Sequence, residues 1–329
     1  MSTDLRAITV LVPGKIHEHA KARLEQTFRL VVLERIDPAL VTAELRAAVR
    51  GIAAAPAIDK AFLGADFVKA LPNLEIIANF GVGYDGIDAA YAGSHGVMVT
   101  NTPDVLTEEV ADTTVGLLIS TVREFSRAES WLRDGHWVRK GNYRQSPLTL
   151  RGRTIGIFGL GRIGLAVARR LEAFGLPIAY HNRRPVDGVA YAYHATLKGL
   201  AEAVDTLVCI APGGPSTEKA IDAGVLAALG GSGVLVNIGR GTTVDEEALA
   251  AALHDGTIAA AGLDVFTDEP NVPQALLDAP NTVLLPHIGS ASVHTRNAMA
   301  DLCVENLVAW FSHGKALTPV PETAAVTAK

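Results

Sequence analysis

The chain has 329 residues, of which 49% are hydrophobic and 19% are charged, and its formal net charge is −6. This composition predicts folded domains with sizeable cores, because disordered segments combine low hydrophobicity with high net charge. The acidic balance offers no electrostatic basis for binding nucleic acid or an anionic membrane surface. The length suits about two domains of roughly 150 residues each.

Cysteine usage and apolar runs narrow the class of protein further. Cys209 and Cys303 are far apart in the sequence, which excludes a disulfide scaffold and a cysteine-ligated zinc site. We expect both to be buried, reduced thiols, and we predict no metal site. The first residues do not have the pattern of a signal peptide, and no apolar stretch reaches the ~18 residues of a membrane span. We therefore expect a cytoplasmic protein without a membrane partner.

The first third of the chain alternates short β-rich runs with amphipathic helical runs. The expected strands are Ile8–Val12, Leu30–Leu33, Gly51–Ala55, Leu74–Ala78 and Val97–Thr100, and the expected helices are His17–Phe28, Pro38–Val49 and Phe62–Ala70. This alternation is typical of βαβ units and a parallel sheet. A long helical pattern follows from Val105 to Leu132, with Glu108 and Glu109 in its first turn, where acidic side chains suit the helix dipole.

The alternation then begins again. The expected strands are Thr154–Phe158, Pro177–His181, Thr206–Ile210, Gly233–Ile238, Ile258–Leu263 and Thr282–Leu285, and the expected helices are Ile163–Phe174 and Val293–Phe311. The tail after Thr318 is expected to fray. We predict an α/β fold of two Rossmann-like or flavodoxin-like parallel-sheet domains with a cleft between them. One comprises residues 1–103 plus 287–329, because the last helix has the wrong position to extend the second sheet, and the other comprises residues 104–286.

A glycine-rich turn lies between the predicted strand Thr154–Phe158 and the helix that follows it. In the run Gly159–Gly164, the glycines at 159, 161 and 164 allow a tight turn, close approach of a pyrophosphate and close packing of the helix on the strand. The helix N-terminus then offers N–H groups and positive potential to the phosphates. This context predicts a dinucleotide-binding Rossmann domain, rather than a plain structural turn. The expected contacts are Leu160, Gly161, Arg162 and Ile163.

The end of the next predicted strand indicates which dinucleotide is bound. Proteins that bind NAD usually place an acidic residue about 20 residues after the glycines, where it holds the ribose 2′-hydroxyl. Here the strand ends in Asn182, Arg183 and Arg184. A carboxylate would repel a 2′-phosphate, whereas guanidinium groups bind it. We predict that these three residues favour NADP(H), with NAD(H) as the alternative cofactor; the other interpretation is that the arginines are solvated loop residues.

Three polar residues, Arg240, Glu269 and His287, follow late strands, where α/β sheets place their ligands. Singly, each is explained by a structural histidine or a solvated charge. Together they match the reduction of a 2-keto acid: a cation for the carboxylate, an acid that titrates near neutrality for the carbonyl oxygen, and a carboxylate that keeps this acid charged and oriented. We predict that they are catalytic, with Arg240 and His287 also binding the substrate.

From about Leu11 to Pro319 the chain resembles the D-isomer-specific 2-hydroxyacid dehydrogenases, and within them the bacterial NADPH-dependent glyoxylate/hydroxypyruvate reductases. The motifs that carry the resemblance are Gly159–Gly164, Asn237–Gly241, Gly262–Phe266 with Glu269-Pro270, and Pro286–Ser290. The resemblance implies that Arg240 binds and polarises the substrate, that Glu269 pairs with the imidazole, and that His287 is the acid/base. It also implies that the first domain binds the substrate.

Further positions follow from the resemblance. The amides of Val82 and Gly83 are expected to receive the substrate carboxylate, since glycines permit the geometry of an anion nest. Cofactor contacts are expected from Thr107, Pro212, Ile238, Asp264 and Gly289. For Asp264 the alternative is a capping or turn role. After Pro212, the run Gly213-Gly214-Pro215 departs from the family's usual Leu-Thr-Pro-like sequence.

We therefore predict NADPH-dependent reduction of small 2-keto acids to D-2-hydroxy acids. Glyoxylate, hydroxypyruvate, 2-ketogluconate and phenylpyruvate all fit this chemistry. The alternative from another class is an NAD(P)-sensing regulatory protein on the same scaffold. A homodimer is expected from the long helix and from the family; Trp137 resembles a tryptophan that reaches the neighbouring subunit's active site, with a packing role as the alternative.

Overall fold

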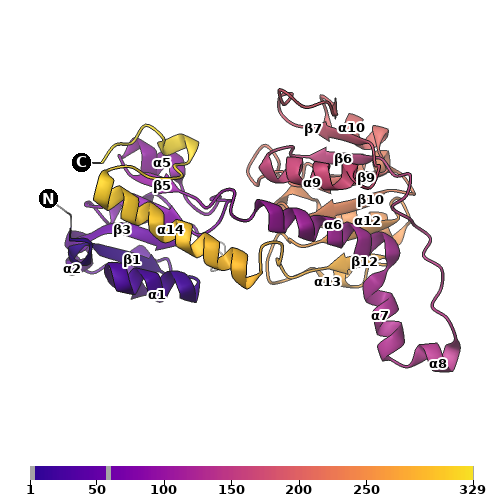
Figure 1. Cartoon of the computed structure of the whole chain (residues 1–329), viewed down its shortest axis with the longest axis horizontal. Helices are drawn as coiled ribbons and strands as arrows, with labels where there is room; N and C mark the ends of the chain where they lie inside the picture. The colour runs from indigo at the N-terminus through magenta and orange to yellow at the C-terminus, as the bar shows by residue number, and fades with distance from the viewer. Residues whose placement is uncertain (1–3, 57–60, 329) are drawn as a thin grey trace. The chain divides into compact units, whose positions relative to one another are not determined.

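The computed structural model describes residues 4–56 and 61–328, and the chain forms two compact units (Figure 1). The discontinuous unit comprises the residues up to Leu106 together with those from Ser292 onward. The central unit is the continuous stretch Thr107–Ala291. Residues 1–3 and 329, at the ends of the first predicted domain, lie outside the described residues. Among the described residues, no helix is both long enough and apolar enough to cross a membrane.

The second boundary between the units lies after Ala291, not before His287 as the sequence suggested. The backbone N–H of His287 donates to the Asp264 carbonyl at 2.9 Å. The next two N–H groups, of Ile288 and Gly289, donate to the Asp264 carboxylate at 2.7 and 2.8 Å. These bonds attach residues 287–291 to the central unit. The first boundary lies at Leu106, three residues beyond the expected position, because α6 begins at Thr107.

The central unit contains a seven-stranded parallel sheet in the order β12-β11-β10-β9-β6-β7-β8. Its strands are β6 Ile155–Phe158, β7 Ile178–His181, β8 Ala192–Tyr193, β9 Thr206–Cys209, β10 Val234–Asn237, β11 Ala260–Leu263 and β12 Thr282–Leu284. Its helices are α6 Thr107–Arg123, α7 Phe125–Arg133, α8 His136–Lys140, α9 Arg162–Glu172, α10 Leu197–Ala203, α11 Ala223–Leu229, η3 Gly241–Thr243, α12 Glu246–His254 and α13 Gln274–Leu277. The first strand, β6, lies mid-sheet, so the chain winds outward in both directions from β6 and β9. This is the Rossmann order, with its switch point between these two strands.

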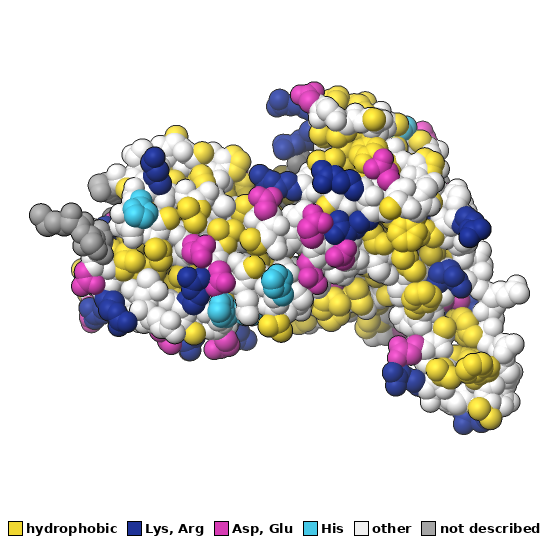
Figure 2. Space-filling view, in the orientation of Figure 1, with side chains coloured by type: hydrophobic (Ala, Val, Ile, Leu, Met, Phe, Trp, Pro, Cys, Tyr) yellow, Lys and Arg dark blue, Asp and Glu magenta, His cyan; other side chains and the backbone are white. Residues whose placement is uncertain are grey.

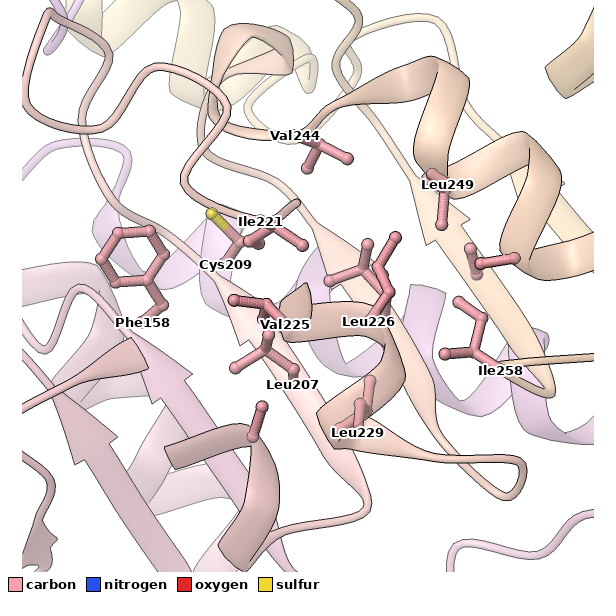
Figure 3. Close-up of a cluster of buried hydrophobic side chains, with 14 of the residues drawn as sticks. Phe158, Leu207, Cys209, Ile221, Val225, Leu226, Leu229, Val244, Leu249 and Ile258 are labelled. Atoms are coloured by element: carbon pink, nitrogen blue, oxygen red, sulfur yellow. The ribbon is translucent and has the colours of Figure 1, made fainter. Parts of the chain in front are cut away.

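Both faces of this sheet are buried, as expected for parallel strands with helices on either side. Along β9, Leu207 and Cys209 belong to the core cluster that Figure 3 shows. Val208 belongs to the other cluster, following the two-residue period of a strand. Cys209 and Cys303 are both buried and free, as predicted. Burial raises the pKa of the Cys209 thiol to about 11, so it stays protonated at neutral pH.

The predicted helix Val105–Leu132 is broken at Glu124, whose φ of 56° is left-handed. The carboxylate of Glu124 is buried, accepts a hydrogen bond from the Tyr143 hydroxyl at 3.0 Å and pairs with Arg144. Ser146 also donates to the Val122 carbonyl at 2.6 Å and satisfies the end of α6. Partners some twenty residues along the chain therefore stop α6 and start α7.

The discontinuous unit contains a five-stranded parallel sheet in the order β2-β1-β3-β4-β5, the flavodoxin-like order. Its strands are β1 Thr9–Pro13, β2 Arg29–Leu33, β3 Val49–Ala54, β4 Ile76–Asn79 and β5 Met98–Thr100. Its helices are η1 Leu5–Ala7, α1 Glu18–Thr27, η2 Pro38–Leu40, α2 Ala43–Ala48, α4 Ala65–Lys69, α5 Ala89–Ser94, α14 Val293–His313 and η4 Pro321–Thr323. The two parallel-sheet units confirm the predicted fold class.

The C-terminal tail is ordered against β5, contrary to the expectation that it frays. Val320 donates its N–H to the Val99 carbonyl at 3.0 Å, and the Thr323 hydroxyl accepts from the Val99 N–H at 3.1 Å. The side chains of Val320 and Thr323 are buried. The tail thus completes the edge of the sheet beside β5.

Candidate active site

An imidazole and a carboxylate from separate loops meet in the central unit. His287 Nδ1 lies 2.8 Å from Oε2 of Glu269, and the other oxygen of Glu269 accepts the Phe266 N–H at 3.0 Å. Burial raises the pKa of Glu269, but the hydrogen bond and charge of His287, the Phe266 N–H and the charge of Arg240 outweigh it. The net pKa lies below its ordinary value. Glu269 is therefore held ionised and oriented toward the imidazole.

The backbone that carries this imidazole is in a rare conformation. His287 has a φ of 54°, in the left-handed region, which a non-glycine residue adopts only when its surroundings impose it. The constraint comes from the three N–H groups of His287, Ile288 and Gly289, which all bond to Asp264. Such a conformation costs about 1–3 kcal/mol and is concentrated at functional sites. The ring of His287 is therefore directed by tertiary hydrogen bonds and not by local preference.

Asp264 is the anchor of that segment, and it is only 1% exposed. Burial raises its pKa, although the two N–H bonds and the charge of His287 act in the opposite direction. A Cβ at Gly289 would lie 3.0 Å from Asp264 Oδ2, which explains the glycine. Both carboxylate oxygens are thus occupied by backbone N–H groups, so the structure gives Asp264 the turn-holding role that the sequence left as the alternative. A cofactor contact by Asp264 or Gly289 stays a prediction.

Arg240 lies three residues after the end of β10 and is flanked by two tightly packed glycines. A Cβ at Gly239 would lie 2.7 Å from the Ala211 carbonyl oxygen, and one at Gly241 only 1.9 Å from the carbonyl carbon of Phe266. Phe266 is also the residue whose N–H holds Glu269. The backbone of Arg240 is therefore packed against the loop that positions Glu269, close enough for its charge to lower the pKa of that carboxyl group. The structure brings the three predicted catalytic residues together in one unit.

The glycine turn after β6 has the geometry of a phosphate cradle. Gly159 has a φ of 99°, and a Cβ at Gly164 would lie 2.5 Å from the Gly159 carbonyl oxygen, so both positions require glycine. A Cβ at Gly161 would meet no atom within 4 Å, so space is open above this turn. Gly161 is also the N-cap of α9 and gives it no side-chain cap. Open space at an uncapped helix N-terminus fits a dinucleotide pyrophosphate, which the backbone at Gly161, Arg162 and Ile163 would hold.

The residues after β7 divide into two roles. Asn182 Oδ1 accepts the Leu160 N–H at 2.7 Å, and its Nδ2 donates to the Leu160 carbonyl at 3.3 Å, so this side chain holds the glycine turn in place. Leu160 itself is 2% exposed, which leaves it a structural role in the turn. Arg183 and Arg184 are exposed, and neither guanidinium has an ion pair or hydrogen bond with any residue that the structure describes. Two uncommitted cations at this strand end fit a 2′-phosphate.

The remaining predicted cofactor residues also lie in the central unit. Thr107 is the first residue of α6, and the exposed Pro212 follows β9. Ile238 is buried after β10, with its Cγ1 3.3 Å from where a Cβ would stand at Gly289. For none of the three does the structure show a contact that tests the prediction.

The predicted carboxylate-binding amides lie in the discontinuous unit, after β4. Val82 and Gly83 are half-buried, and neither N–H has an acceptor in the part of the chain that the structure describes. Asn79 Nδ2 donates to the Gly81 and Gly83 carbonyls at 3.0 and 2.9 Å, so the loop is closed by a side chain and not by its own backbone. This leaves two adjacent N–H donors for an anion.

Sequence reasoning missed Asn79 and Asn101, whose side-chain amides hold this loop. Asn101 Nδ2 donates to the Val82 carbonyl at 2.8 Å. The signal was present, because both asparagines stand at or just after the ends of buried strands, as Arg240 does. Among the described residues, no group of three or more His, Cys, Asp and Glu side chains could hold a metal ion.

A model of the D-isomer specific 2-hydroxyacid dehydrogenase NAD-binding domain matches residues 115–289. Together with the full-length relatives below, this match shows that the chain belongs to the D-isomer specific 2-hydroxyacid dehydrogenase family, a class of dinucleotide-dependent oxidoreductases.

Particular relatives are similar over nearly their whole length. Glyoxylate/hydroxypyruvate reductase A of Arabidopsis thaliana is 43% identical over 319 residues, which cover 96% of this chain and 100% of the relative. The 2-ketogluconate reductase of Gluconobacter oxydans is 39% identical and covers 96% of this chain and 98% of its own. Among solved structures, an NADPH-dependent glyoxylate/hydroxypyruvate reductase of Sinorhizobium meliloti, in complex with NADP and malonate, is 60% identical. It has a TM-score of 0.93 and covers 98% of this chain and 99% of its own.

Proposed function

We propose that this protein uses NADPH to reduce small 2-keto acids, with glyoxylate and hydroxypyruvate first among them, to D-2-hydroxy acids. The observation that carries the proposal is the 2.8 Å contact between His287 and the ionised Glu269, beside Arg240 and in the same unit as the phosphate cradle. The names of the similar proteins support glyoxylate and hydroxypyruvate, and one of them supports 2-ketogluconate.

In this proposal the three side chains divide the chemistry of the carbonyl group. Glu269 engages Nδ1 of His287, which leaves Nε2 to carry the proton that the carbonyl oxygen takes up. Arg240 binds the keto acid and polarises its carbonyl group, and the Val82 and Gly83 amides receive its carboxylate. NADPH, when bound, supplies the hydride to C2. His287 ends the step neutral and regains its proton from solvent.

Cofactor choice is assigned to Arg183 and Arg184, whose exposed guanidiniums follow β7 at the position where NAD-binding proteins carry an acid. A 2′-phosphate would meet two cations here and no carboxylate. The NADP bound by the Sinorhizobium meliloti reductase supports the same choice. NAD(H) is the weaker alternative, since its ribose hydroxyl gains little from the arginines.

We also propose that the protein is a homodimer and that it is cytoplasmic. Four large apolar side chains are exposed on or beside α7 and α8, where Figure 2 shows yellow side chains gathered: Phe125, Leu132, Trp137 and Val138. Exposed large apolar side chains on neighbouring helices support an interface with a second copy. Trp137 is 57% exposed and donates to Asn142 at 3.1 Å. The molar mass in solution of wild type and Val138→Asp tests the dimer: a wild-type monomer contradicts it.

The test of the function is a steady-state assay of NADPH consumption with glyoxylate, hydroxypyruvate, 2-ketogluconate and phenylpyruvate, followed by chiral analysis of the products. We expect turnover of at least the first two acids, and the D-isomer wherever C2 of the product is a stereocentre. Tight NADPH binding without turnover of any 2-keto acid would instead support the NAD(P)-sensing regulatory alternative.

A further inference from the structure

Hydrogen bonds to the carbonyl groups of the Val82–Gly83 loop fix the direction of the Val82 and Gly83 N–H groups. In a trans peptide, the carbonyl and the N–H of one group point in opposite directions. The Gly81 carbonyl, which shares its peptide with the Val82 N–H, accepts from Asn79 Nδ2 at 3.0 Å and from the Thr102 N–H at 2.9 Å. The Val82 carbonyl, which shares its peptide with the Gly83 N–H, accepts from Asn101 Nδ2 at 2.8 Å. The hydrogen bonds to these two carbonyl groups therefore fix the orientation of both peptide planes.

Asn101 is in turn held by the C-terminal tail. Its carbonyl accepts the Thr318 hydroxyl at 2.6 Å, and its N–H donates to the Thr318 carbonyl at 3.3 Å. Asn306 on α14, which is fully buried, donates from Nδ2 to the same Thr318 hydroxyl at 2.8 Å and accepts the Thr318 N–H at 3.0 Å. A continuous series of hydrogen bonds thus runs from α14 through Thr318 and Asn101 to the Val82–Gly83 peptide.

We propose that Asn101, held by Thr318 of the C-terminal tail, is a positioning residue that sets the affinity for the carboxylate of the substrate. The inference rests on the proposed function, because it takes the Val82 and Gly83 amides as the carboxylate receptor. Donors fixed in direction before the ligand arrives bind an anion more strongly than donors that must first be oriented. In this proposal the side chain of Asn101 does not contact the substrate; it acts by orienting the peptide group between Val82 and Gly83.

The experiment compares Asn101→Ala and Thr318→Val with wild type, and uses Asn73→Ala as a matched control. Asn73 also donates from Nδ2 to a backbone carbonyl, that of Ala47 at 2.9 Å, in the same unit but away from the loop. For each protein we would measure kcat and KM for glyoxylate, the inhibition constant of oxamate (an unreactive carboxylate mimic), the Kd of NADPH and the thermal midpoint. Thr318→Ser, which keeps the hydroxyl, serves as the rescue variant.

We expect Asn101→Ala to raise the KM for glyoxylate and the inhibition constant of oxamate together by about tenfold, the scale of one hydrogen bond to a charged group. Thr318→Val should raise both about threefold, and Thr318→Ser should restore them. The Kd of NADPH should stay within about twofold of wild type, and Asn73→Ala should match wild type throughout. A merely structural role would lower the thermal midpoint without this paired rise in the two constants.

Unchanged KM and inhibition constants in both variants would overturn this inference and leave the proposed function intact. If Asn101→Ala does not fold, the pair Thr318→Val and Thr318→Ser decides alone. A wild-type protein that turns over no 2-keto acid would overturn the proposed function and this inference with it.

Discussion

Glu269 Oε2 and His287 Nδ1 are 2.8 Å apart, and each residue is held by a separate set of backbone hydrogen bonds, Glu269 by Phe266 and the His287 segment by Asp264. Both side chains are therefore held in position independently of the contact between them. An acid whose partner is fixed beforehand keeps its orientation through the reaction cycle. This preorganisation gives the proposed chemistry its clearest tests.

Replacing the imidazole should abolish proton transfer without weakening the binding of NADPH. We expect His287→Ala to lower kcat for glyoxylate reduction by about a thousandfold, the usual contribution of a general acid, while the Kd of NADPH stays near wild type. Stopped-flow or steady-state NADPH consumption and a fluorescence titration give the two quantities. His254→Ala, at an exposed position at the end of α12, is the control. A kcat within a few fold of wild type in His287→Ala would exclude the residue as the acid.

Removing the charge of Glu269 should move the pH profile. The pKa of Glu269 lies below its ordinary value, so an ionised carboxylate stands 2.8 Å from the imidazole, and Glu269→Gln removes that charge while keeping the shape of the side chain. Reduction needs that imidazole protonated, so the rate should fall as pH rises, and in Glu269→Gln the fall should begin at a pH lower by about one unit. The reverse oxidation, which needs neutral imidazole, should begin at a correspondingly lower pH. Glu247 is exposed on α12, and Glu247→Gln should leave the pH profiles of reduction and oxidation unchanged. An unchanged pH profile in Glu269→Gln would count against Glu269 as the partner of His287.

The exposed guanidiniums of Arg183 and Arg184 after β7 should decide between NADPH and NADH. We expect the double variant Arg183→Ala and Arg184→Ala to lower kcat/KM for NADPH by about tenfold to a hundredfold, because two charge-assisted bonds to the 2′-phosphate are lost. The value for NADH should change by less than about twofold. Arg151→Ala removes another exposed arginine of the same unit and should behave as wild type. Equal losses for both cofactors would point to a structural effect instead.

Packing around Arg240 should be intolerant of a single methyl group. A Cβ at Gly241 would lie 1.9 Å from the Phe266 carbonyl carbon, so Gly241→Ala must displace the loop that holds Glu269. We expect a loss of about 2 kcal/mol or more in the free energy of unfolding, together with reduced kcat. Gly231→Ala is the matched control, since its Cβ would have its nearest neighbour at 3.6 Å and its φ is not left-handed. Urea unfolding of both variants measures the difference.

The sheets and the acid–base residues were readable from the sequence for a shared reason. Parallel strands buried on both faces are short apolar runs, and the chemistry of such sheets lies where those runs end. Arg240, Glu269 and His287 could therefore be predicted by position. The small helices α10 to α13 were not among the expected elements, because four to nine mostly small and apolar residues show little helical periodicity.

What the sequence concealed depends on partners distant along the chain. The break at Glu124 requires Tyr143 and Arg144, and the order of the tail requires Val99 and Asn101. The sequence is compatible with Asp264 as a cofactor ligand and as a turn residue. In the structure its two carboxylate oxygens accept the N–H groups of Ile288 and Gly289. Local patterns cannot specify such pairings, since the energy comes from tertiary contacts.

The position of the boundary after Ala291 bears on how this chain can diversify. One uninterrupted stretch, Thr107–Ala291, contains the glycine turn, Arg240, Glu269 and His287, whereas the amides that we propose as carboxylate receptor belong to a unit assembled from both chain ends. Substitutions around those amides are therefore expected to change the affinity for the substrate while the proton donor and its partner stay unchanged. Laboratory evolution of substrate affinity is therefore best begun in residues 1–106 and 292–329, a set that includes none of Arg240, Glu269 and His287.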